Sequence, residues 1–169
     1  AIVGGNGAGK STTLKAVCGI CRPYRGKVKV LGKPVEKYKS QELFRGCLAM
    51  LPQDPKSLFV KKTVLEDLQE MTQNEQDIRE TAEICQITSL LKSHPYDLSG
   101  GEQQRVALAK SIAKSTDIIL ADEPTGSLDE RNRSYVMDIL KELNRQGKTI
   151  VVVTHDPYVS DCATRHIAL

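Results

Sequence analysis

The stretch Gly4-Gly5-Asn6-Gly7-Ala8-Gly9-Lys10-Ser11 decides the fold, because its glycines, lysine and hydroxyl stand at the offsets of a phosphate-binding loop. The apolar residues 1–3 before it predict the end of a buried strand. Residues 10–20 after it place Leu14, Val17 and Cys18 near helical spacing, which predicts a helix. The loop is therefore expected between a strand and a helix, where a phosphate site must lie.

The residue types in this loop suit a nucleotide phosphate. Glycines allow a tight turn that directs several backbone N–H groups at one anion, and the helix dipole adds positive potential at the same point. Lys10 supplies a charge for the terminal phosphates, and the Ser11 hydroxyl is a candidate ligand for Mg²⁺. The alternative is a glycine-rich strand–helix turn with an incidental lysine, which leaves the complete spacing unexplained.

Composition limits the class of protein. With 169 residues, of which 40% are hydrophobic, the chain can bury one core, so we expect a single globular domain. The net charge of +3 is too small to indicate nucleic-acid binding by itself. No apolar run approaches the roughly 18–20 residues of a membrane span, and the first residues resemble a folded strand rather than a leader, so we expect a soluble chain.

The five cysteines form an odd set, which favours reduced thiols over a disulfide framework. Cys18 and Cys21 stand at the C-x-x-C spacing of some redox and metal sites. No second pair with ligand spacing accompanies them, and Cys18 falls on the apolar face of the predicted helix. We therefore expect these thiols to act as small buried hydrophobic groups.

The rest of the chain alternates strand and helix patterns. The predicted strands cover residues 27–30, 47–51, 118–121 and 149–153, and the predicted helices cover residues 39–44, 63–91, 99–113 and 131–146. The last two strands are largely apolar, as strands buried on both faces are. This alternation predicts an α/β fold in which helices cover both faces of a parallel sheet.

Two acidic residues, Asp122 and Glu123, follow one of these buried strands. They would lie at the carboxyl edge of the sheet, where open α/β sheets bind ligands. Asp122 can hold Mg²⁺ through its water shell, and Glu123 can polarise the water that attacks a γ-phosphate. The alternative is that both acids only cap the turn toward Pro124. His155 follows the next strand at the same edge and is a candidate γ-phosphate contact rather than a plain surface residue.

A second anion site is predicted at Ser99-Gly100-Gly101, which opens a helix with exposed N–H groups and a favourable dipole. An ordinary serine cap would explain Ser99 but not the whole string Leu98-Ser99-Gly100-Gly101-Glu102-Gln103-Gln104-Arg105. The chain therefore carries two predicted phosphate-binding surfaces.

With this string the sequence resembles the ATP-binding cassette (ABC) ATPases essentially from end to end. Residues 4–11 resemble the Walker A loop, and residues 98–105 resemble the signature motif. Residues 118–122 resemble Walker B, and residues 127–129 resemble the D-loop. Three single residues match as well: Gln53 is similar to the Q-loop glutamine, Glu123 to the catalytic glutamate and His155 to the switch histidine. The resemblance implies a P-loop NTPase (RecA-like) fold, with one ABC ATPase domain over residues 1–169 and a helical subdomain at about 56–98. It also implies that the N-terminal β subdomain is truncated and that the adenine-stacking residue lies outside this chain, so we expect this segment alone to bind ATP weakly.

In this family two cassettes pair head to tail around ATP and Mg²⁺. The implied ATP contacts are Gly4, Asn6, Gly7, Ala8, Gly9, Lys10, Ser11 and Thr12 of one cassette, with Ser99, Gly100, Gly101 and Asp129 of its partner. The implied metal contacts are Ser11, Gln53 and Asp122, and the implied catalytic residues are Glu123, His155 and Gln53. The second cassette would be a copy of this chain or a paired homologue. ATP would join the two cassettes, and hydrolysis would release them.

The resemblance further implies a peripheral ATPase on the cytoplasmic face of the membrane, which drives transmembrane permease subunits and binds no nucleic acid. Pro95 before the signature motif is similar to prokaryotic importer and lipoprotein-release cassettes, and Gln53-Asp54-Pro55 resembles energy-coupling-factor ATPases. Residues 121–129 are similar to lipoprotein and macrolide exporters. Cargo and transport direction therefore stay open.

Two other functions could use such a cassette: that of a soluble ABC ATPase and that of a non-catalytic nucleotide-binding regulator. A soluble ABC ATPase of DNA repair or chromosome organisation would carry coiled-coil or zinc-binding inserts between Gln53 and Ser99, and this interval is compact. A soluble ABC ATPase of translation would carry two cassettes in one chain with a charged linker, which this sequence neither shows nor excludes. A non-catalytic regulator would have no need of Lys10, Glu123 and His155 together. We therefore expect a transport ATPase.

Overall fold

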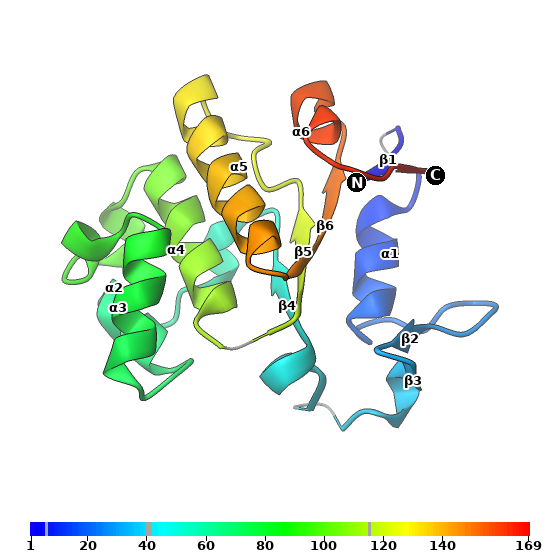
Figure 1. Ribbon diagram of the computed structural model, residues 1–169, viewed down its shortest axis with the longest axis horizontal. Coiled ribbons are helices and arrows are strands. Elements are labelled where there is room, and N and C mark those ends of the chain that lie inside the picture. Colours follow the sequence, from blue (N-terminus) through cyan, green and yellow to red (C-terminus); the bar gives the residue numbers. More distant parts are fainter. Residues whose placement is uncertain (6, 40–41, 115) are drawn as a thin grey trace.

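The computed structural model describes residues 1–5, 7–39, 42–114 and 116–169. Its centre is a five-stranded sheet of β1 (Ile2–Val3), β4 (Leu48–Leu51), β5 (Ile118–Asp122), β6 (Thr149–Thr154) and β7 (Ile167–Ala168), shown in Figure 1. The strand order is β4-β5-β6-β1-β7, and every neighbouring pair is parallel. The predicted α/β fold with a parallel sheet is confirmed.

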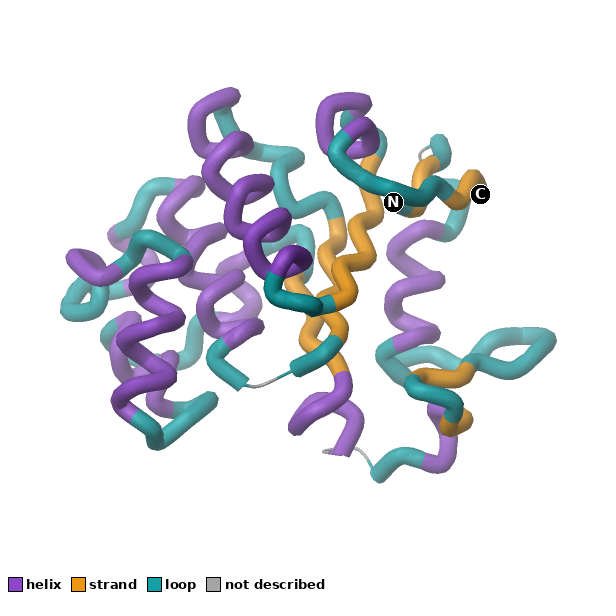
Figure 2. Tube along the Cα trace, viewed as in Figure 1, coloured by secondary structure: helices purple, strands orange, loops and turns teal. Residues whose placement is uncertain are grey.

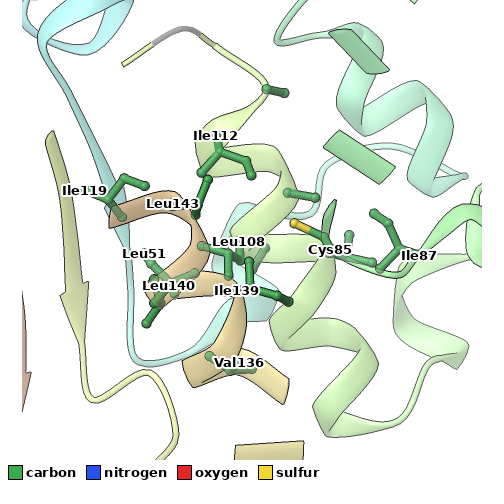
Figure 3. Close-up of a cluster of buried hydrophobic side chains, with 14 of the residues drawn as sticks. Leu51, Cys85, Ile87, Leu108, Ile112, Ile119, Val136, Ile139, Leu140 and Leu143 are labelled. Atoms are coloured by element: carbon green, nitrogen blue, oxygen red, sulfur yellow. The ribbon is translucent and has the colours of Figure 1, made fainter. Parts of the chain in front are cut away.

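Helices cover both faces of this sheet. Helix α1 (Lys10–Val17) lies on one side, and α4 (Gly100–Ile112) and α5 (Glu130–Arg145) lie on the other, as Figures 1 and 2 show. Alternation along β5 explains the two layers, because Leu120 packs in the cluster that contains Leu14 of α1, whereas Ile119 packs in the cluster formed by α4 and α5. Figure 3 shows this second cluster, in which Leu108 meets the apolar stripe of α5.

The segment 63–91, which was predicted to be helical, contains two helices, α2 (Val64–Gln69) and α3 (Glu75–Ile84), followed by the short turn Thr88–Leu90. Both helices begin at a side-chain cap: the Thr63 hydroxyl accepts from the Glu66 N–H, and the Asn74 side chain accepts from the Gln76 N–H. The polar residues around Asn74 thus stop one helix and start the next. The segment is helical as predicted, and the break between the two helices was not predicted.

Smaller elements also differ from the sequence prediction. A two-residue turn with positive φ at Leu31 (48°) and Gly32 (79°) joins β2 (Lys29–Val30) to β3 (Lys33–Pro34), the backbone form that suits a tight hairpin. The helical turn expected at 39–44 instead covers Leu43–Cys47, and residues 40–41 lie outside the described part. Three other short helical turns cover Val35–Lys37, Pro55–Leu58 and Pro95–Asp97.

The C-terminal elements α6 (Pro157–Asp161) and β7 were missed, because five and two residues are too few to show a period. The strand at 149–153 was expected to be fully buried, but Thr149 is exposed, and Ile150 and Val151 are half-buried. All five cysteines are unpaired, with Cys18 and Cys85 buried. Burial raises the pKa of the Cys18 thiol to about 11, so it stays protonated at neutral pH. None of the described helices is both long and apolar enough to cross a membrane.

Candidate nucleotide-binding site

Four strands deliver the predicted site residues to one edge of the sheet. Gly4 follows β1, Gln53 follows β4, Glu123 follows β5 and His155 follows β6. Because the four strands are parallel and adjacent, their carboxyl ends lie together. The register sets Leu51 beside Ala121 and Asp122 beside Val153, so the strands end at nearly the same level.

The glycine-rich loop leads directly into α1. Gly7 and Gly9 have φ values of 83° and 92°, a backbone form that strains any side-chain-bearing residue, and Gly9 is the residue before the helix. Ala8 N–H donates to the Gly5 carbonyl oxygen over 3.2 Å, which closes the turn. Thr12 is exposed on the first turn of α1. Asn6, predicted as part of this site, lies outside the described residues.

Lys10 lies back over the loop. Its side chain is only 7% exposed, and its Nζ donates to the carbonyl oxygens of Gly4 (2.8 Å) and Gly5 (2.9 Å). In the described part of the chain no carboxylate forms an ion pair with it. A nearly buried ammonium is thus held by neutral carbonyls at the start of a helix, where an anion would be the stronger partner.

Ser11 joins the loop to β5. Its Oγ donates to Asp122 Oδ1 over 2.9 Å, a contact between residues 111 positions apart, and Asp122 is 5% exposed. Hydroxyl and carboxylate oxygens are the ligand types that Mg²⁺ prefers, so this pair fits a magnesium ion. No group of three or more His, Cys, Asp or Glu residues with metal-site geometry occurs among the described residues. A metal here would therefore complete its shell with water and phosphate oxygens.

Glu123 and His155 form the next contact along the edge. Glu123 has a φ of 47°, unusual for a residue with a side chain, and its N–H donates to the Val153 carbonyl oxygen over 2.9 Å. Its Oε1 lies 2.7 Å from His155 Nδ1, and its Oε2 accepts from Thr154 Oγ1 over 3.4 Å. Glu123 is thus held in place, whereas the His155 side chain is 61% exposed.

Gln53 is at this edge but not in this network. It is exposed in the turn after β4, and no hydrogen bond of its side chain occurs among the described residues. Its neighbour Asp54 caps the following helical turn by accepting from the Lys56 N–H over 3.0 Å. The predicted metal and catalytic roles of Gln53 stay predictions.

The signature segment forms the start of α4. Ser99 caps the helix in a reciprocal pair with Glu102: the Glu102 N–H donates to Ser99 Oγ over 3.5 Å, and the Ser99 N–H donates to Glu102 Oε2 over 2.9 Å. The Ser99 hydroxyl also lies 2.6 Å from Glu102 Oε2 and donates to it. These bonds from Ser99 lower the pKa of the Glu102 carboxyl. The pattern Ser-x-x-Glu was visible in the sequence, yet Glu102 was not among the predicted residues. Gly100 is exposed and Gly101 is buried.

Asp129 caps α5. Its Oδ1 accepts from the Asn132 N–H over 2.8 Å, and the Asn132 side chain donates to both carboxylate oxygens. These bonds, the backbone one first, lower the pKa of Asp129. In the described residues no hydrogen bond joins Asp129 or Ser99 to the loop at 4–12. One chain therefore brings together the loop, Asp122, Glu123 and His155, but not the second predicted anion site.

Comparisons with known proteins agree with this geometry. The family model described as ABC transporter matches residues 1–126. The chain is 39% identical over 165 residues to the energy-coupling factor transporter ATP-binding protein EcfA2 of Methanospirillum hungatei, covering 92% of this chain and 42% of that protein. It is 37% identical to the cell division ATP-binding protein FtsE of Escherichia coli, covering 92% of this chain and 74% of that one.

Solved structures show the same fold. The dimeric structure of MJ0796, a bacterial ABC transporter cassette, superposes with a TM-score of 0.88 at 32% identity, covering 99% of this chain and 79% of that chain. Three of the curated relatives are much longer than this chain, which spans 42%, 36% and 59% of their lengths. The chain belongs to the ABC transporter family and carries the family's ATP-binding cassette.

Proposed function

We propose that this chain binds and hydrolyses ATP as the nucleotide-binding subunit of an ABC transporter. The observation that carries the proposal is Lys10, an ammonium that is 7% exposed and whose hydrogen-bond acceptors among the described residues are two carbonyl oxygens above a helix start. The phosphates of a nucleotide would give this charge the anionic partner that the loop does not supply. Another solved MJ0796 dimer, 33% identical to this chain, is bound to ADP and Pi.

Hydrolysis needs a group that orients water beside the terminal phosphate. Glu123 suits this role because its carboxylate is held at the sheet edge: Oε2 accepts from Thr154 Oγ1, and His155 Nδ1 lies 2.7 Å from Oε1. Mg²⁺, held through the oxygens of Ser11 and Asp122, would neutralise charge that develops on the phosphates. His155 would keep the glutamate oriented and, being largely exposed, can reach a γ-phosphate.

The remaining expectations belong to the same proposal. The 1–169 unit acts as one ABC ATPase domain with a helical subdomain at about 56–98. It pairs with a second cassette through Ser99–Gly101 and Asp129, and it works at the cytoplasmic face of the membrane with permease subunits. Relatives solved as dimeric cassettes, and CbiO1 of Clostridium perfringens described as part of the cbiONQ complex, support this arrangement. No partner carrying nucleic acid is proposed.

The direct test is steady-state ATP hydrolysis by the full-length protein, with Mg²⁺ and with EDTA. We expect Glu123→Gln to reduce kcat by at least about a hundredfold, in line with the loss of general base catalysis. The matched control is Glu83→Gln on the exposed side of α3, which should leave kcat within about twofold, since exposed sites away from the chemistry contribute little. Undiminished turnover in Glu123→Gln would remove Glu123 from this role.

A further inference from the structure

Asn132, in the first turn of α5, contacts two predicted ATP-site segments of its own chain. Its Nδ2 donates to both carboxylate oxygens of Asp129, over 3.1 and 2.9 Å. Its Oδ1 accepts from Arg105 Nη1 of α4 over 3.3 Å. The Asn132 amide thus donates through its nitrogen to the residue that caps α5 and accepts through its oxygen from Arg105 of α4. It connects the cap of α5 to α4, the helix that the signature segment opens.

Gly101 is pressed against the same amide. A Cβ placed on Gly101 would lie 2.2 Å from Asn132 Cγ and Oδ1, far inside van der Waals contact. A Cβ on Gly100 would meet nothing within 4 Å. Gly101 and Arg105 stand four residues apart on α4, so they share the helix face that meets Asn132. A side chain at position 101 would therefore have to displace the Asn132 amide of the same chain.

The residues beside Asn132 extend this contact. Arg133 Nη1 forms an ion pair with Asp156 Oδ2 over 3.3 Å, and Asp156 directly follows His155. The Arg105 guanidinium also lies 5.8 Å from the Tyr135 ring centroid, a second attachment of α4 to α5. The first turn of α5 is thus attached on one side to the signature helix and on the other to the segment that carries His155.

We propose that Asn132 is a positioning residue that holds Asp129 and Gly101 as one unit, so that a change at the signature segment of a chain is passed to Asp129 of that chain. The inference rests on the proposed function, in which both segments face ATP held between two cassettes. Movement of α4 on closing around the partner's ATP would carry the Asn132 amide, and with it the Asp129 carboxylate. Asn132 therefore couples the two ATP sites without touching a nucleotide.

The test compares full-length wild type with Asn132→Asp, Asn132→Ala and the control Asn144→Ala. Asn144 lies on the same helix and donates one hydrogen bond to the Lys148 carbonyl oxygen, far from the signature segment. Asn132→Asp keeps the shape of the side chain, and an acidic residue is favourable in the first turn of a helix. The substitution nevertheless removes both N–H donors to the Asp129 carboxylate. If Asn132 only filled space between α4 and α5, the Asn132→Asp variant would hydrolyse ATP as wild type does.

We expect both Asn132 variants to lower kcat and the Hill coefficient for ATP, kcat by at least about fivefold, the lower end of typical coupling between sites. ATP affinity of the dilute, unpaired chain should stay within about twofold, because the hydrogen bonds of the Asn132 side chain among the described residues go to Arg105 and Asp129 and not to the loop at 4–12. Asn144→Ala should match wild type in both. Unchanged kcat and Hill coefficient in Asn132→Asp would overturn the inference alone, whereas a wild type without ATP turnover would overturn the proposed function and this inference with it.

Thermal unfolding tests the contact without any nucleotide. Gly101→Ala should lower Tm, because the new methyl displaces an amide that holds two partners, whereas Gly100→Ala should not. Combining Gly101→Ala with Asn132→Gly should recover part of the lost Tm, since the opposing side chain is gone. Equal Tm changes for the two glycine variants, or no recovery in the double variant, would contradict the contact on which the inference rests.

Discussion

Glu123 has a strained backbone and holds its carboxylate in a fixed position at the predicted nucleotide site. A side-chain-bearing residue at a φ of 47° costs of order 1–3 kcal/mol, and it persists only where neighbours hold it. Here the neighbours are the Val153 carbonyl oxygen, which fixes the backbone, and the Thr154 and His155 groups, which fix the carboxylate. The strain turns the chain after β5 so that the carboxylate stays beside the end of β6.

Glu102 permits a residue-scale prediction on pH. Because its folded pKa is lowered by bonds from Ser99, its contribution to stability is complete above its unfolded pKa and is lost as the pH falls through the folded value. Glu102→Gln can still accept from the Ser99 N–H but does not titrate there. We therefore expect wild type to lose more stability than Glu102→Gln between about pH 5 and pH 3, the range of carboxyl titration. Urea unfolding at several pH values measures this, and parallel pH curves would contradict it.

At the scale of elements, α4 is the helix on which the rest of the helical layer packs. It contacts α2, α3, α5, β4 and the turn Pro55–Leu58 that follows Gln53. The side chain of Lys110, near the end of α4, is 7% exposed, and its Nζ donates to Asp67 Oδ1 of α2 and to the Leu58 carbonyl oxygen, each over 2.6 Å. One lysine thus attaches the signature helix to α2 and to the segment behind Gln53.

Breaking this pair should be costly. Lys110→Met leaves Asp67, which is fully buried, without its cation, so we expect a loss of about 3–5 kcal/mol in the free energy of unfolding. The matched control is Arg79→Met, which breaks an exposed pair with Glu75 and should cost less than about 1 kcal/mol. Denaturant titration gives both values. A similar small loss in both variants would show that the buried pair does not stabilise the helical layer.

Local patterns predicted most of the elements and most residues at the sheet edge, because a glycine-rich loop and acids after a strand are short-range signals. Contacts between distant residues were not predictable in this way. Ser11 meets Asp122 across 111 positions, and Arg105 meets Asn132 across 27. Asn132 belongs to none of the predicted motifs, and its contacts with α4 follow from the packing of α4 against α5. The break before Asn74 was missed because its capping signal lies inside a run of good helix formers.

For the whole molecule, the central proposal is that one chain supplies only part of an ATP site. The edge of the sheet gathers the loop, Asp122, Glu123 and His155, whereas Ser99–Gly101 and Asp129 make their hydrogen bonds within the α4–α5 layer. A second copy that presents its signature segment to this edge would supply the missing contacts. In such a pair the nucleotide phosphates would lie between the helix start of one chain and that of the other, so the union of the two chains would depend on ATP.

The measurement that tests this most directly is the molar mass of full-length Glu123→Gln by analytical ultracentrifugation, with and without ATP. Slow hydrolysis should preserve the bound nucleotide, so the account predicts the mass of one chain without ATP and of two chains with ATP. The same variant carrying Ser99→Glu, which places a negative charge against the partner's phosphates, should stay at one chain. A Glu123→Gln chain that binds ATP yet keeps the mass of one chain would contradict the account.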